Sequence, residues 1–87
     1  MTMTKEKILE IQKDITLKTV DGAKKYDEEH GLTGKTSIEK DLGADSLTIV
    51  EFFMEVEDKF GVGVTDEEVT ELHNADELTD LLIKKGV

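Results

Sequence analysis

Apolar residues return at helical spacing near the start of the chain. Between Lys5 and Lys18, isoleucines recur at positions 8, 11 and 15, and charged residues fill most of the positions between them. This spacing places the three side chains on one face of a helix. The pattern predicts an amphipathic helix whose buried face is formed by Ile8, Ile11 and Ile15.

Three further segments have helical patterns. Ser46 to Phe60 is the most regular, with Asp45 or Ser46 as a suitable N-cap and Gly61 as a suitable stop, and it predicts the central helix. Thr65-Asp66-Glu67-Glu68 has capping-box spacing and predicts a short helix through Leu72. Asn74 begins a last helix, whose predicted buried face consists of Leu78, Leu81 and Leu82.

The connection from Thr19 to Asp45 has no such periodicity. It is long for an irregular segment of a small domain, so it should contain structure or have a function. Thr36-Ser37-Ile38-Glu39 has the reciprocal capping-box spacing, which predicts a helical turn over residues 37–42 with Ile38 and Leu42 facing inward. The pattern leaves open whether Ala23 to His30 forms another turn.

Strands have little support, because the only alternating apolar run is the short, glycine-rich segment 61–64. We therefore predict an all-α fold: a small bundle of three main helices plus one short helix, with a long first connection. All 87 residues are expected to form one domain, since a chain of this length supports a single thin core.

Charge narrows the choice of partners. The formal net charge is -10, from 21 Asp and Glu against 11 Lys and Arg, which disfavours nucleic acid and favours basic protein surfaces. No apolar run is long enough for a signal peptide or a membrane span, so we expect a cytoplasmic protein. We also expect it to be a monomer. Because there is no cysteine, any thiol chemistry would have to be imported.

The predicted central helix has one acidic side and an unusually wide apolar side. The acidic side contains Thr48, Glu51, Glu55, Asp58 and Lys59. The apolar arc exceeds what one packing partner requires. The helix contacts all the others, or part of the arc lines a cavity or a partner surface, and both explanations can hold together. Leu47 and Met54 border the acidic side, where they suit a protein contact.

The segment before this helix carries the most specific signal. Asp41-Leu42-Gly43-Ala44-Asp45-Ser46-Leu47 resembles the attachment motif of the acyl carrier protein family at all seven positions. The matching spacing continues through Val50-Glu51 and Glu57-Asp58-Lys59-Phe60-Gly61 to residue 69. The acidic charge and the form of the motif favour the fatty acid synthesis type.

The resemblance implies that Ser46 carries a covalent 4'-phosphopantetheine arm, with Asp45 and Leu47 beside it. In that family a separate phosphopantetheinyl transferase adds the arm from coenzyme A, and the arm holds acyl groups as thioesters. A helix N-terminus suits this role, because its free backbone N–H groups and positive dipole end favour phosphate.

The family also uses its central helix to meet basic patches on the transferase and on fatty acid synthesis enzymes. The resemblance carries this role to six residues: Glu51, Met54, Glu57, Asp58, Val64 and Asp66. Three departures are visible. Thr48 stands where Asp is common, Thr65 stands where Pro is common, and the connection before the motif is longer than usual.

Other functions fit the sequence less well. Ser46 with His30 or His73 and an aspartate makes a nominal catalytic set, but such sets arise by chance in a chain of this length, and we predict no enzyme. No segment has the ligand spacing of a calcium loop, and no metal site is predicted. A peptidyl, polyketide or D-alanyl carrier would use the same arm. An unmodified acidic interaction module is the alternative of another class.

Overall fold

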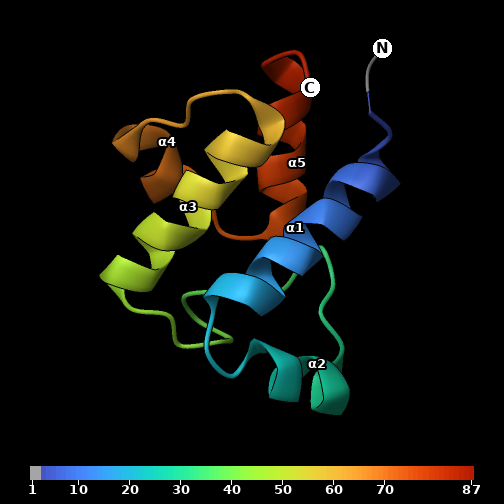
Figure 1. Ribbon diagram of the computed structural model, residues 1–87, viewed down its shortest axis with the longest axis vertical. Coiled ribbons are helices and arrows are strands. Elements are labelled where there is room, and N and C mark those ends of the chain that lie inside the picture. Colours follow the sequence, from blue (N-terminus) through green and yellow to red (C-terminus); the bar gives the residue numbers. More distant parts are fainter. Residues whose placement is uncertain (1–2) are drawn as a thin grey trace.

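The computed structural model describes residues 3–87, and it is built from α-helices (Figure 1). The helices are α1 (Lys5–Thr19), α2 (Ala23–His30), α3 (Ser46–Phe60), α4 (Asp66–Glu71) and α5 (Ala75–Lys84). No strand occurs within these residues, and the segment 61–64 is a connection. The prediction of an all-α fold is confirmed.

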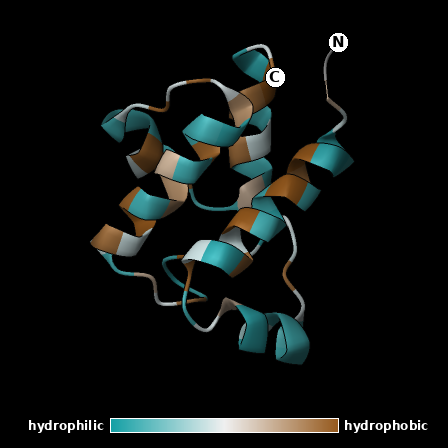
Figure 2. Ribbon diagram, viewed as in Figure 1, coloured by the Kyte–Doolittle hydropathy of each residue, from teal (hydrophilic) through white to brown (hydrophobic). Residues whose placement is uncertain are grey.

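Helix α1 is the centre of the bundle, because α2, α3 and α5 all contact it. The core lies where the apolar stripes of α1, α3 and α5 meet, and α2 is hydrophilic along nearly its whole length (Figure 2). The buried apolar residues of this core are Ile8, Ile15, Phe52, Val56, Leu78, Leu82 and Val87. The predicted inward face of α1 is confirmed, with Ile11 partly buried against the core.

Side-chain caps fix where the helices begin. Asp45, not Ser46, caps α3, and its carboxylate accepts a hydrogen bond from the Thr48 N–H at 2.9 Å. The predicted capping box of α4 is present in both directions between Thr65 and Glu68. Asn74 caps α5 as predicted. Local sequence therefore determines the N-termini of α3, α4 and α5.

The structure settles the state of residues 23–30, which the sequence left open: they form α2, a helix of eight residues inside the long connection that adds a fifth helix to the predicted bundle. Tertiary contacts stabilise it. Ala23 is fully buried, and the Asp27 carboxylate pairs with Lys13 of α1 at 3.4 Å and accepts from the Leu32 N–H at 2.8 Å. Since α2 has no apolar stripe, hydrophobic periodicity could not reveal it.

The turn over residues 37–42 forms, but with other partners than predicted. Ser37, not Thr36, caps the turn by accepting from the Lys40 N–H, and Asp41, not Glu39, accepts from the Ser37 N–H. The Thr36 hydroxyl instead accepts from the Thr33 N–H. Ile38 and Leu42 are half-buried. The cap therefore lies one residue later than predicted, and its reciprocal acceptor lies two residues later.

The buried face of α5 also differs from the prediction. Leu78 and Leu82 are buried, but Leu81 is only half-buried, and Thr79 is buried in its place. Thr79 is accommodated because its hydroxyl is hydrogen-bonded to Gln12 of α1. A polar pair thus occupies part of the α1–α5 interface.

Candidate functional site

Ser46 is the first residue of α3, and it is exposed. Asp45 performs the capping, so the Ser46 hydroxyl is not needed for it and forms no hydrogen bond with any residue in 3–87. The backbone N–H groups of Ser46 and Leu47 precede the first intrahelical bond, which Ile49 donates to the Asp45 carbonyl. A free hydroxyl therefore lies at the positive end of a 15-residue helix.

The Asp45 carboxylate faces the backbone of α3. Its hydrogen bond from the Thr48 N–H is the main reason that the pKa of Asp45 lies below its usual value of 3.8. The ionised form is therefore the one that caps the helix, and it leaves Ser46 to point outward.

This lowered pKa gives a testable pH dependence. The contribution of Asp45 to stability is fully present above its unfolded pKa and is lost as the pH falls through the lower folded value. Asp45→Asn keeps a good N-cap but removes the titration. We expect the wild type to lose its advantage in melting temperature over Asp45→Asn between pH 5 and strong acid. An advantage that stays constant over that range would contradict this account.

The loop before Ser46 is held on both sides of Gly43. The Ala44 N–H donates to the Ile38 carbonyl at 2.9 Å, and Asp41 is bonded to Ser37. Gly43 has φ of 69°, in the left-handed region that favours glycine, and a Cβ there would meet no atom within 4 Å. The motif requires glycine here because of its backbone conformation, not because of crowding.

An exposed apolar stripe runs along α3 from beside Ser46. Leu47, Val50 and Met54 are 66%, 55% and 61% exposed, and their spacing puts them on one face. Leu47 and Met54 are therefore accessible, and their contact with a partner protein stays a prediction. Val50 is the member of this stripe that the predicted partner residues lack, although its spacing from Leu47 and Met54 could have identified it.

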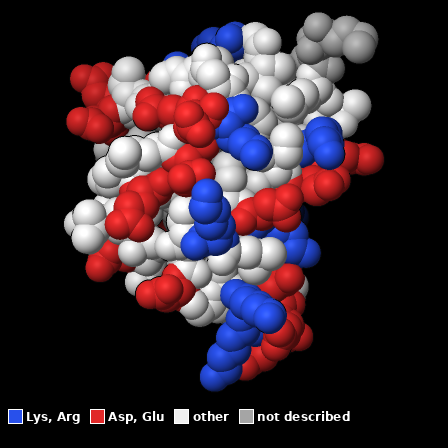
Figure 3. Space-filling model, in the orientation of Figure 1, with Lys and Arg blue, Asp and Glu red and all other residues white. Residues whose placement is uncertain are grey.

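Carboxylates accompany this stripe. Glu51 and Asp58 are exposed, and neither forms an ion pair with any other residue that the structure describes. Glu55 instead pairs with Lys18 of α1 at 3.2 Å. Acidic side chains gather over α3 and α4 in Figure 3. Two of the three carboxylates on the predicted acidic side are therefore free to meet a basic partner.

The remaining predicted partner residues lie at the other end of α3. The half-buried Glu57 accepts a hydrogen bond from the Val64 N–H at 2.8 Å, so its carboxylate is directed toward the connection 61–64. Asp66 is exposed at the start of α4. Glu57 therefore orders the connection, whereas Asp66 extends the acidic surface.

A cavity of about 790 Å³ opens beside the apolar side of α3. Ile49, Phe52 and Phe53 form its α3 wall, and it also borders α1, the connection 32–40 and the segment 69–78. Ile49 lies three residues after Ser46, which is about 4.5 Å along the helix axis. Ser46, the exposed stripe and a cavity with an apolar α3 wall thus converge on one helix.

The two histidines lie apart from this arrangement. His30 stacks on Tyr26 in α2, and His73 is bonded to Glu77 at 3.0 Å. No group of three potential metal ligands occurs within residues 3–87. Over the same residues, no helix is long and apolar enough to cross a membrane.

Comparison with known proteins connects these features. Residues 25–82 match the family model described as a phosphopantetheine attachment site. An acyl carrier protein of Rubrobacter xylanophilus is 37% identical over 57 residues, which cover 66% of this chain and 70% of the relative. One of Chloroherpeton thalassium is 42% identical over 45 residues, which cover 52% of this chain and 56% of the relative.

A solved structure shares the fold. The acyl carrier protein of Enterococcus faecalis superimposes with a TM-score of 0.66 at 28% identity, covering 94% of this chain and 98% of its own. The similarity therefore extends over nearly the full length of both chains.

Proposed function

This chain belongs to the acyl carrier protein family, and on that premise we propose that Ser46 carries a phosphopantetheine arm on which fatty acyl intermediates are held as thioesters. The observation that supports Ser46 most strongly is its free, exposed hydroxyl at the N-terminus of α3. The family role is that of a carrier, and the enzymes it serves supply the catalysis.

The residues around Ser46 fit such an arm. In the loading step, the Ser46 oxygen forms a bond to the phosphorus nearer the pantetheine in coenzyme A. The bond from that phosphorus to the adenosine bisphosphate breaks, and the serine proton passes to the transferase. The product phosphate would lie next to the N–H groups of Ser46 and Leu47, which favour an anion. Asp45 does not compete for them, since it binds the Thr48 N–H.

The cavity supports an acyl cargo. It starts within about one turn of Ser46, and its α3 wall consists of Ile49, Phe52 and Phe53. Each buried CH₂ group contributes about 0.8 kcal/mol, so an alkyl chain gains by entering. Fatty acyl chains therefore suit the α3 wall of this cavity, although the wider lining also contains charged side chains such as Glu10, Lys13 and Glu39.

The proposal is tested by incubating the chain with coenzyme A and phosphopantetheinyl transferases of several types. Intact-protein mass spectrometry should show the addition of one phosphopantetheine. No addition with any transferase would contradict the carrier function and favour an unmodified acidic interaction module. Addition followed by aminoacyl or polyketide loading in the cell would retain the arm but change the pathway.

Glu51 and Asp58 should guide the transferase and the synthesis enzymes by charge. We expect Glu51→Lys or Asp58→Lys to slow loading about tenfold at low salt, because steering by exposed charges acts over a long range there. The effect should shrink at 1 M salt, where the Debye length is about 3 Å. Glu28→Lys on α2 makes the same change in net charge and is the matched control. Equal slowing at both salt concentrations would point to a lost fold instead.

A further inference from the structure

The outer face of α2 carries charges in a definite order. Ala23 is the buried residue of this helix, and at about 100° per residue four charged side chains are centred on the opposite side. They are Lys24, Lys25, Glu28 and Glu29, and all four are exposed. The lysines lie in the first turn and the glutamates in the last turn. The face is therefore basic at one end and acidic at the other.

This order of charges does not stabilise the helix itself. The N-terminus of a helix is its positive end and the C-terminus its negative end, so lysines in the first turn and glutamates in the last are both unfavourable. Helices α1, α4 and α5 have acidic residues in the first turn instead. The Lys25–Glu29 pair, at 3.9 Å, has the weaker of the two possible orders for a helical pair. The charge pattern of α2 therefore needs another explanation.

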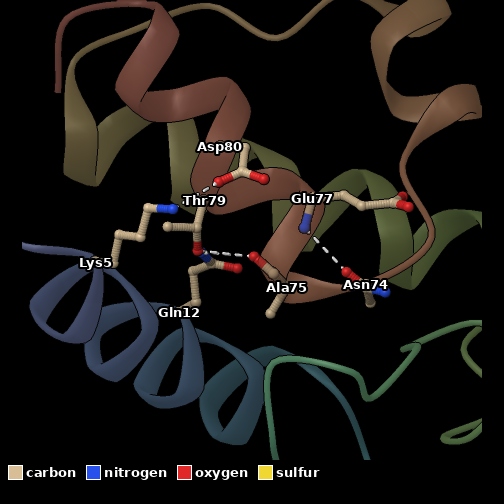
Figure 4. A network of polar contacts seen from close by, with 7 residues as sticks. All are labelled: Lys5, Gln12, Asn74, Ala75, Glu77, Thr79 and Asp80. Atoms are coloured by element: carbon tan, nitrogen blue, oxygen red, sulfur yellow. Dashed lines mark hydrogen bonds and ion pairs between the residues drawn. The ribbon is translucent and has the colours of Figure 1, made fainter.

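Exposed charges of this chain can find partners on a neighbouring helix. Lys5 of α1 pairs with Asp80 of α5 at 3.4 Å (Figure 4). By contrast, Lys24 and Glu28 on the outer face of α2 form no ion pair with any residue in 3–87. This face points away from α1, so its charges are accessible to another molecule.

The pattern of this face is complementary to itself. A two-fold axis across the middle of α2 places the basic end of one copy against the acidic end of a second copy. Lys24 and Lys25 of each copy then lie opposite Glu29 and Glu28 of the other, so that every lysine meets a glutamate. A second copy of this chain therefore fits the face in an antiparallel orientation.

Most of the remaining surface would repel a second copy. Each chain has a net charge of -10, and acidic side chains gather over α3 and α4 (Figure 3). On the outer face of α2 the charges of the lysines and glutamates cancel. Helix α2 also lies at one end of the longest axis of the molecule (Figure 1), so contact there keeps α3 and α4 of the two copies apart. The outer face of α2 is thus where two copies meet with least repulsion.

We propose that two copies of this chain associate reversibly through the outer faces of α2. The contact is small, because an eight-residue helix is about 12 Å long and stable complexes bury roughly 1,200 Å² or more. Exposed ion pairs are also individually weak. We expect a dissociation constant on the order of 1 mM, so the chain is a monomer at the lower concentrations of a loading assay. Ser46 belongs to α3 and lies outside this face.

The test is an NMR titration of the unloaded full chain with itself. The protein concentration is raised from about 0.05 to about 3 mM, a range that spans the expected dissociation constant. The amide signals of residues 24–30 should shift and translational diffusion should slow, whereas the signals of the exposed stripe on α3 should stay in place. No concentration dependence, or shifts that leave residues 24–30 unmoved, would overturn the inference.

Charge-reversed variants test the pairing itself. One variant carries Lys24→Glu with Lys25→Glu, and the other carries Glu28→Lys with Glu29→Lys, so each face has a single sign and repels its own copy. Each variant alone should associate at least about tenfold more weakly than the wild type. An equimolar mixture of the two should associate at least as strongly as the wild type. A mixture in which the variants ignore each other would overturn the inference.

Glu67→Lys with Glu71→Lys on α4 is the matched control. It changes the net charge as much as Glu28→Lys with Glu29→Lys does, at exposed positions away from α2 (Figure 1). The control should associate at least as strongly as the wild type, and an equal loss would assign association to net charge and overturn the inference. If α2 unfolds in a charge-reversed variant, the wild-type titration still decides. Because no arm is needed, a negative result leaves the proposed role of Ser46 unchanged.

Discussion

Ser46→Ala is expected to abolish the addition of phosphopantetheine completely, while leaving the fold intact. The hydroxyl that the arm requires is removed, but Ser46 is exposed and has no hydrogen bond from its side chain to residues 3–87. Such a substitution changes stability by less than about 0.5 kcal/mol. Mass spectrometry after incubation with coenzyme A and a transferase gives the loading, and thermal unfolding gives the stability.

The chain offers a matched control for this variant, since Ser37 is its only other serine. Ser37→Ala removes the hydroxyl that caps the turn over residues 37–42, so it should lower stability slightly and still accept one phosphopantetheine. Loading of Ser46→Ala, or loss of loading in Ser37→Ala with the fold retained, would be incompatible with attachment at Ser46.

Leu82→Ala is expected to cause the largest loss of stability. Leu82 is fully buried between the helices of the core, and truncating such a leucine costs about 2–5 kcal/mol. The melting temperature should fall by about 8 °C or more. A domain of this kind has about 5–15 kcal/mol in total, so partial unfolding at ambient temperature is expected at the upper end of that cost.

Leu81→Ala is the control for Leu82→Ala, because it removes the same atoms from the neighbouring, half-buried position of α5. It should cost about 1 kcal/mol. Chemical denaturation of both variants measures the difference. The sequence pattern treats both leucines as buried, whereas the structure buries only Leu82. Equal losses would therefore contradict the structure.

Sequence identified the elements whose signals are local. Asp45, Thr65 and Asn74 act as caps on their own helices, so the starts of α3, α4 and α5 follow from a few neighbouring residues. The predicted bounds of α3 agree with the structure. Its surplus of apolar surface was also visible, and the structure divides that surplus between the cavity and the exposed stripe.

Features that depend on distant partners could not be predicted. Helix α2 relies on Lys13 of another helix and on the Leu32 N–H, and its own sequence has no apolar stripe. Gln12 reads as a polar residue and belongs to the core only because Thr79, 67 residues away, is its partner. Periodicity assigns a residue to a face, but it does not pair one helix with another.

The candidate site also combines features that local sequence predicts with features that depend on the folded chain. The motif before α3 pointed to Ser46, and the structure supplies the free hydroxyl and the cap that leaves it free. The role of Glu57 could not be read from its place in the sequence, because the Val64 N–H that it binds is seven residues away. Val50 completes a stripe whose exposure only the folded chain reveals.

The most direct test of the carrier function is mass spectrometry of the protein purified from its native cell. The account predicts molecules in which Ser46 carries phosphopantetheine. In some of them the arm also carries a fatty acyl group, which hydroxylamine should release because it cleaves thioesters. A chain without any modification at Ser46 would contradict the carrier function, and an arm that carries only aminoacyl groups would contradict the fatty acyl cargo.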